Sequence, residues 1–364
     1  CTEWYMQNDP EHLLELSNGK KKLPLTDKKD ILTKCIYGVD IDVHAVEVSK
    51  FSLLIKLIED ETPASVKECV PILPDLSSNI KNGNSLICRD DIHGKELPIE
   101  VLCNIKPFEW ETINGGAKFD AIVGNPPYVK TEDIHTLETE EEFAVYKKKY
   151  KSAYKQFDKY FLFLEKAFDL LKEDGQMCYI VPNKFYKIGA GQELRRITAK
   201  YVSKLDDFGD MQLFPDKTIY SCIITLCKEC NKQLQYTNVI SLTDLWTGKE
   251  QENIEIKNER LDENPWRLTT DIKFMKMIAK VEEHGKPLGE IVNIFNGIQT
   301  SAERPKPVYW FSKDEIVSEK EDEIIVDKFE KRYHIEKSIL KPFFKPTKAD
   351  EKGMGTYSIL KTDK

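Results

Sequence analysis

The chain has 364 residues, 54 of them basic and 62 acidic, so its formal net charge is −8 at pH 7. This length favours two domains, and a hydrophobic fraction of 40% is typical of a folded globular protein. No apolar run reaches the ~20 residues that a membrane span needs, and the acidic balance excludes a polybasic nucleic-acid binder. Nine scattered cysteines, an odd number in a long chain, indicate a reducing cytoplasm rather than a disulfide scaffold.

The apolar pattern predicts alternating strands and helices. The first 30 residues are polar and predict the end of a helix followed by a loop. Strands are expected at 35–40, 79–87, 119–124, 177–182, 202–208 and 220–227, and helices at 43–58, 157–171 and 194–199. This order predicts an α/β fold with a doubly wound, mostly parallel, Rossmann-like sheet. Short β-like runs at 291–295 and 308–311 predict a second, smaller α+β domain, with the boundary after residue 262.

The tetrapeptide Asn125-Pro126-Pro127-Tyr128 directly follows the expected strand at 119–124. Two consecutive prolines fix the backbone, so the loop is rigid at the carboxyl end of a strand, where open α/β sheets bind ligands. The Asn125 side chain and the Pro126 carbonyl offer two acceptors to an amine on a flat ring, and Tyr128 offers an aromatic face. Fixed acceptors would aim the lone pair of that amine at an electrophile without a nucleophile or a metal. An ordinary strand-ending turn explains the tetrapeptide equally well.

Four further segments accompany this loop in order: Gly38-Val39-Asp40-Ile41-Asp42, Asn82-Gly83-Asn84-Ser85-Leu86, residues 180–185 and Leu213-Phe214-Pro215. Together the five segments resemble the S-adenosylmethionine-dependent adenine-N6 DNA methyltransferases of restriction–modification systems. The resemblance is to the gamma-ordered group of Type IIG enzymes and spans roughly residues 30–230. It implies a methyltransferase domain over 1–262 and the start of a DNA target-recognition domain over 263–364. The implied partner is double-stranded DNA with a flipped adenine.

The same resemblance assigns cofactor-binding residues. Asp40 would bind the ribose hydroxyls of S-adenosylmethionine, because an ionised carboxylate can accept from both at once. Ile41 would pack on the cofactor's adenine, Asn84 would accept from its amine, and Asn125 would also border the cofactor. Asp42 is the better candidate for a helix N-cap.

The resemblance assigns the catalytic and base-stacking residues as well. Asn125 and Pro126, with Pro127 and Tyr128, would form the catalytic loop that binds the amine of the target adenine. Tyr128 and Phe214 would stack on the two faces of the flipped base, each contact being worth about 1–3 kcal/mol. Phe214 has an alternative role as an ordinary buried aromatic residue.

Lysines and tyrosines alternate just after the catalytic loop, a pattern that can bind phosphates and bases. A solvated helix start is the alternative interpretation. The expected DNA-backbone contacts are Lys147, Lys148, Lys149, Lys151 and Lys155. Cys227 and Cys230 form a C-x-x-C pair without a second pair or a nearby histidine, so no metal site is expected.

The glycine-rich cofactor loop of the family has no counterpart in this sequence. We therefore expect an N-terminally truncated methyltransferase domain that by itself binds S-adenosylmethionine weakly and is inactive. A nuclease domain on the same full-length chain is compatible with the family. Two other interpretations stay open: a non-catalytic DNA-binding or specificity module, and a methyltransferase acting on protein glutamine or ribosomal RNA. The residues from 263 onward count against the latter, because those enzymes lack a large C-terminal recognition domain.

Overall fold

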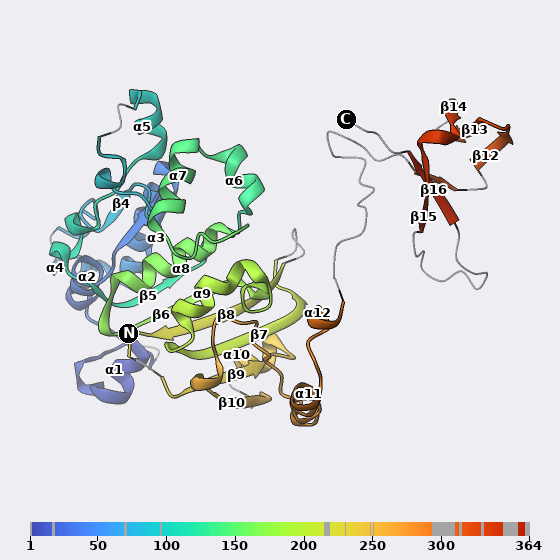
Figure 1. Ribbon diagram of the computed structural model, residues 1–364. Coiled ribbons are helices and arrows are strands. Elements are labelled where there is room, and N and C mark those ends of the chain that lie inside the picture. Colours follow the sequence, from blue (N-terminus) through green and yellow to red (C-terminus); the bar gives the residue numbers. More distant parts are fainter. Residues whose placement is uncertain are drawn as a thin grey trace. The chain divides into compact units, whose positions relative to one another are not determined.

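A computed structural model describes residues 2–16, 19–68, 71–94, 97–214, 219–229, 231–247, 249, 251–292, 310–312, 315–328, 331–344 and 356–360 (Figure 1). The chain divides into two compact units, Cys1–Met275 and Lys276–Lys364. Residues 263–275 thus fall in the first unit, where Trp266 is buried and its backbone N–H donates to the carbonyl of Tyr186 at 2.8 Å. The function expected of each domain remains a prediction.

Within the described part of the first unit, six strands form one sheet in the order β10-β9-β7-β8-β6-β5. They are β5 (Phe119–Gly124), β6 (Leu171–Pro182), β7 (Val202–Gln212), β8 (Tyr220–Cys227), β9 (Gln233–Asn238) and β10 (Asn253–Lys257). The pairs β5–β6 and β7–β9 are parallel, whereas β6–β8, β7–β8 and β9–β10 are antiparallel. The α/β class is confirmed, but the sheet is mixed. Because β8 follows β7 too soon for a crossover helix, these two strands can pair only in the antiparallel sense.

A separate parallel pair is formed by β3 (Gly38–Asp40) and β4 (Ile80–Asn82), with Val39 opposite Lys81. Between them run α3 (Val43–Ile58) and α4 (Pro63–Glu68), and α2 (Leu25–Lys34) precedes β3. α3 begins where Asp42 accepts the N–H of His44 at 2.8 Å, which confirms Asp42 as its N-cap. A small core of Leu25, Leu32, Val46, Leu57, Leu76 and Ile80 joins these elements.

The main core lies between the six-stranded sheet and α8 (Lys159–Leu170), which packs along β6 (Figure 1). Phe161, Leu164 and Ala167 of α8 are buried with Met177 and Val181 of β6. Helices α5 (Ile99–Ile105), α6 (Thr131–Leu137), α7 (Glu140–Lys149), α9 (Gln192–Thr198) and α10 (Leu242–Trp246) complete this unit, with α1 (Thr2–Asn8), β1 (Leu14–Glu15) and β2 (Lys21–Lys22) at its start.

The second unit is mostly β-structure in its described residues. It holds β11 (Trp310–Ser312), β12 (Ile316–Glu319), β13 (Glu323–Lys328), β14 (Lys331–Glu336), β15 (Leu340–Phe344) and β16 (Thr356–Leu360). These form two antiparallel sheets, β12-β13-β14 and β11-β16-β15. α11 (Ile272–His284) spans the division between the units, and α12 (Leu288–Ile291) follows it. The β-like run expected at 291–295 begins at the end of this helix, and residues 293–295 lie outside the described residues, as do 308–309. In the parts of the chain that the structure describes, no helix is long and apolar enough to cross a membrane.

Candidate active site

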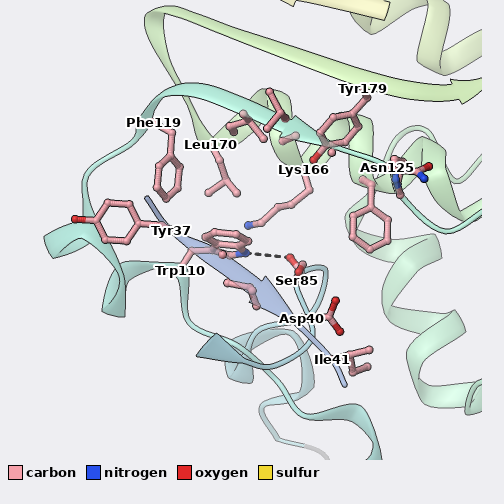
Figure 2. Close-up of a pocket in the computed structure, with 18 of the residues that line it drawn as sticks. Tyr37, Asp40, Ile41, Ser85, Trp110, Phe119, Asn125, Lys166, Leu170 and Tyr179 are labelled. Carbon is pink, nitrogen blue, oxygen red and sulfur yellow. Dashed lines mark hydrogen bonds between the residues drawn. The ribbon is translucent and has the colours of Figure 1, made fainter. Parts of the chain in front are cut away.

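A cavity of 740 Å³ lies between β3 and β5 (Figure 2). At one end the rings of Tyr37 and Phe119 meet with centroids 5.9 Å apart. At the other end, where β3 and β5 both finish, the cavity is lined by Asp40, Ile41 and Asn125. Both strands point toward this end in Figure 2. The carboxyl ends of two strands therefore share one cavity, which is the usual ligand position in an open α/β sheet.

The two strands that border the cavity present open edges. Among the described residues, β3 pairs only with β4 and β5 pairs only with β6. Val123 of β5 is 80% exposed. An apolar side chain of a strand in an α/β sheet is normally covered, so this exposure is unusual. A strand laid between β3 and β5 would join the two sheets into one.

Asp40 and Ile41 lie on a well-supported turn at the end of β3. One carboxylate oxygen of Asp40 accepts the N–H of Asp42 at 2.8 Å, which leaves the second oxygen open to the cavity. Ile41 is exposed and offers an apolar surface beside it. Asn82, to which the sequence analysis assigned no role, donates to the carbonyls of Asp40 and Ile41 at 3.0 Å. Asp40 and Ile41 are thus held where a ligand in the cavity would meet them.

Asn84 lies on the wall of the same cavity but is already hydrogen-bonded. Its side-chain oxygen accepts the N–H of Leu86 at 3.0 Å, and its amide nitrogen donates to Oε1 of Glu142 at 3.3 Å. Only part of its hydrogen-bonding capacity is left for a ligand. Glu142 is a residue that sequence reasoning missed.

The catalytic-loop residues Asn125, Pro126 and Pro127 line the cavity. Among the described residues no hydrogen bond engages the Asn125 side chain. Val129, next along the loop, accepts the backbone N–H of Lys159 at 2.8 Å, and Lys130 forms a β-bridge with Asp158. The loop is therefore fixed to the start of α8, while the Asn125 amide is available.

Tyr128 and Phe214 lie in direct contact, and their stacking on the two faces of a base remains a prediction. Their ring centroids lie 6.2 Å apart at 69°, an edge-to-face contact that leaves no room for a base between them. The Tyr128 hydroxyl donates to the carbonyl of Ile180 at 3.0 Å. Burial raises the pKa of this hydroxyl to about 12, so it stays protonated at neutral pH. Pro215, which follows Phe214, lies outside the described residues.

The five lysines expected to contact DNA fall into two groups. Lys147 donates to the carbonyls of Ala153 and Lys155 at 2.8 and 3.2 Å, and Lys149 pairs with Asp91 at 2.5 Å. Lys148, Lys151 and Lys155 are exposed, and within the described parts of the chain none of their ammonium groups forms an ion pair. Among the described residues, the ammonium groups of Lys148 and Lys151 have no protein partner, that of Lys155 lies 4.9 Å from the centre of the Tyr154 ring, and Lys147 keeps its charge because its partners are uncharged carbonyls. Cys230 of the C-x-x-C pair lies outside the described residues, and no cluster able to hold a metal occurs among the residues that are described.

Residues 34–214 match the model of the Eco57I restriction-modification methylase family. The chain is 39% identical over 363 residues to the Type II restriction enzyme and methyltransferase RM.Eco57I of Escherichia coli, covering 98% of this chain and 35% of that protein. It is also 39% identical over 85 residues to the Type II methyltransferase M.BstVI of Geobacillus stearothermophilus, covering 23% of this chain and 14% of the relative.

Two solved structures show a more distant likeness. The type IIG restriction endonuclease BpuSI superposes with a TM-score of 0.36 at 12% identity, over 65% of this chain and 30% of that one. A nuclease-deletion mutant of the Type ISP restriction-modification enzyme LlaGI, in complex with a DNA substrate mimic, gives 0.39 at 15% identity, over 68% and 26%.

The sequence matches cover the part of the chain that holds the parallel pair β3–β4, the strand β5 and the loop after it. The chain belongs to the Eco57I restriction-modification methylase family. The family resemblance read from the motifs is thereby confirmed. The chain spans about a third of the length of RM.Eco57I.

Proposed function

We propose that this chain is the methyltransferase part of a restriction–modification enzyme that methylates the N6 amine of an adenine flipped out of double-stranded DNA. The observation that carries the proposal is the Asn125 amide, which is free of protein partners among the described residues and faces the same cavity as Asp40. Incubation of the full-length protein with DNA and labelled cofactor should yield N6-methyladenine on nucleoside analysis. Label in a methylated cytosine, or in no base, would overturn the proposal.

The cavity fits S-adenosylmethionine. Its 740 Å³ lies within the range of about 300–1,000 Å³ for small-molecule sites. Asp40 keeps one carboxylate oxygen for the ribose hydroxyls, and exposed Ile41 can cover an adenine face. Asn84 would meet the adenine amine with its remaining hydrogen-bonding capacity. When bound, this cofactor supplies a methyl group on a positively charged sulfur, which is an electrophile.

The catalytic loop would act by positioning. The Asn125 side-chain oxygen and the Pro126 carbonyl accept the two hydrogens of the adenine amine and direct its lone pair at the electrophile. Tyr128 stacks on one face of the base, and Phe214 moves from its edge contact to cover the other. Two stacking contacts of about 1–3 kcal/mol each largely offset the few kcal/mol that base flipping costs.

The open edges of β3 and β5 support the expectation that the glycine-rich loop comes from elsewhere in the full-length enzyme. A strand between these edges would complete the cavity wall, and its loop would hold the methionine end of the cofactor. RM.Eco57I is named as both a restriction enzyme and a methyltransferase, and we propose that any nuclease likewise lies outside this chain. Such an enzyme would act in the cytoplasm, where the DNA is.

The 364-residue chain alone should bind S-adenosylmethionine more weakly than micromolar, because within the described residues β3 and β5 border the cavity and each lacks a second partner strand. Isothermal titration calorimetry measures this directly, with the full-length protein as the control. Micromolar affinity of the isolated chain would show that the cavity is complete without a further strand.

Replacing Lys148 by alanine should weaken DNA binding by the full-length protein and reduce the slope of log affinity against log salt by about 0.9, as expected for one lost phosphate contact. Thermal unfolding should not change, because the Lys148 ammonium has no partner among the described residues. Lys147 is the matched control: Lys147→Ala should lower the melting temperature, because its ammonium holds the carbonyls of Ala153 and Lys155. An unchanged salt slope for Lys148→Ala would argue against phosphate contact.

A further inference from the structure

A buried polar cluster links the two halves of the proposed site. It consists of Asn84, Glu138, Glu142, Tyr146 and Lys159, and we refer to it as the Glu142 cluster. Asn84 and Glu142 are 4% and 5% exposed, and Tyr146 is fully buried. The Glu138 and Lys159 side chains are 12% and 14% exposed. Asn84 follows β4, Glu138 lies in the turn between α6 and α7, Glu142 and Tyr146 lie on α7, and Lys159 begins α8.

On the cofactor side, the cluster holds Asn84. Oε1 of Glu142 accepts from the Asn84 amide at 3.3 Å, and Oε2 accepts from the backbone and hydroxyl of Thr139 at 3.0 and 3.1 Å. Glu142 is therefore the third residue of a capping box on α7 as well as the partner of Asn84. Helix capping explains the contacts with Thr139 but not the contact with Asn84.

On the catalytic side, the cluster holds the loop that carries Tyr128. The Lys159 ammonium pairs with Glu138 and lies 5.8 Å from the centre of the Tyr146 ring. The backbone N–H of the same lysine donates to the carbonyl of Val129 at 2.8 Å. Lys159 and Asn84 both line the cavity, so the cluster spans from the cofactor wall to the catalytic loop.

The charges in this cluster are costly to bury. Desolvation raises the pKa of Glu142, with a further increase from Glu138, while Thr139 and Lys159 act in the opposite direction. Tyr146 also faces Glu138 and Glu142, and burial together with these acids raises the pKa of its hydroxyl. Replacing buried charged groups by apolar residues of the same volume is often neutral or stabilising, so the charges of this cluster are not explained by stability alone.

We propose that Glu142 and Lys159 are positioning residues for methyl transfer. Glu142 orients Asn84 toward the cofactor. Lys159, through its ion pair with Glu138, anchors the start of α8, whose backbone N–H holds the loop that presents the target base. The inference rests on the proposed function and deepens it. Because both residues belong to one cluster, the cofactor and the base are held at a set separation, as in-line transfer between them requires.

The Asn84–Glu142 hydrogen bond can be tested by exchanging the donor and the acceptor between the two positions. In full-length Asn84→Asp two carboxylates face each other, and we expect kcat/KM for S-adenosylmethionine to fall at least about tenfold near neutral pH. In Asn84→Asp/Glu142→Gln the glutamine amide donates to the new aspartate, and we expect recovery to within about threefold of wild type. The activity of the single variant should rise as pH falls, because one shared proton restores a donor between the carboxylates.

Lys159 is tested on the catalytic side. Lys159→Met should lower kcat about tenfold or more with little change in KM for S-adenosylmethionine, whereas Lys159→Arg, which keeps the pair with Glu138, should retain most activity. Lys249→Met is the matched control, because Lys249 pairs with Asp244 on the surface. If Lys159 had only a structural role, Lys159→Met would lower the melting temperature but would not lower kcat selectively while KM stays unchanged.

The outcomes are distinct. A wild-type enzyme that methylates no DNA removes the proposed function and this inference with it. If the wild type is active but the double variant is as impaired as Asn84→Asp, the inference is wrong and the proposed function stands. The same holds if Lys159→Met keeps the wild-type kcat. Thermal unfolding of the 364-residue variants identifies loss of folding, and Glu142→Gln, which retains an acceptor for Thr139, provides a variant expected to fold.

Discussion

Full-length enzyme carrying Asn125→Ala is expected to transfer methyl groups at least about 10³-fold more slowly than wild type while binding DNA with nearly unchanged affinity. Asn125 supplies one of the two acceptors that orient the target amine, and the rigid prolines after it keep the remaining loop in place. Its side chain makes no hydrogen bond within the described residues, so alanine removes no contact that stabilises the fold. Initial rates with a methyl-labelled cofactor and DNA titrations measure the two quantities.

Asn253→Ala is the matched control for this experiment. Asn253 lies exposed at the start of β10, and its side chain donates to the carbonyl of Gln251 at 3.2 Å. This variant should keep its full rate and its DNA affinity. If Asn125→Ala retained activity, the catalytic assignment of the loop would be wrong. If it lost DNA binding together with activity, a DNA-binding module would explain the site better.

Asp40→Ala should weaken S-adenosylmethionine binding by the full-length enzyme about 10- to 100-fold, the range expected for hydrogen bonds to a charged acceptor. The carboxylate ends β3 with one oxygen on the N–H of Asp42 and the other open to the cavity. Equilibrium titration of the cofactor measures the loss. Stability should change little, since Asp40 is exposed.

Asp42, two residues away, offers a control whose replacement should change stability but not cofactor affinity. It caps α3, so Asp42→Ala should lower the free energy of unfolding by about 1 kcal/mol and leave cofactor affinity within a small factor. Equal losses of cofactor affinity in the two variants would mean that the whole turn, and not the Asp40 carboxylate, binds the ligand.

The elements predicted from sequence were those with continuous apolar or helical patterns. The helix at 43–58 and the strands at 119–124 and 220–227 have the expected bounds in α3, β5 and β8. The antiparallel pair of β9 and β10 was not predicted, because polar residues interrupt both strands and their burial depends on pairing with each other and with β7. The antiparallel direction of β8 follows from the short connection after β7, which the apolar pattern of each strand does not describe.

The candidate site divides in the same way. Asp40 and the Asn125-Pro126-Pro127-Tyr128 loop lie in short local motifs that end strands, so they could be identified from sequence. Glu142 and Lys159 are ordinary acidic and basic residues of helices, and their relation to the cavity arises from contacts such as Asn84–Glu142, which joins residues 58 apart.

The lysine-rich segment shows that composition does not identify which lysines are available to contact DNA. Its five lysines look equivalent in sequence, yet Lys147 and Lys149 are engaged with Ala153, Lys155 and Asp91. Which ammonium groups remain free depends on how α7 packs, and so only the structure separates them.

Modification mapping of DNA from cells that express the full-length protein tests the central claim most directly. N6-methyladenine is expected at one sequence motif throughout the genome with the wild-type protein, and none at that motif with Asn125→Ala. Unmodified adenines in the wild-type sample, or modification that persists in Asn125→Ala, would contradict it.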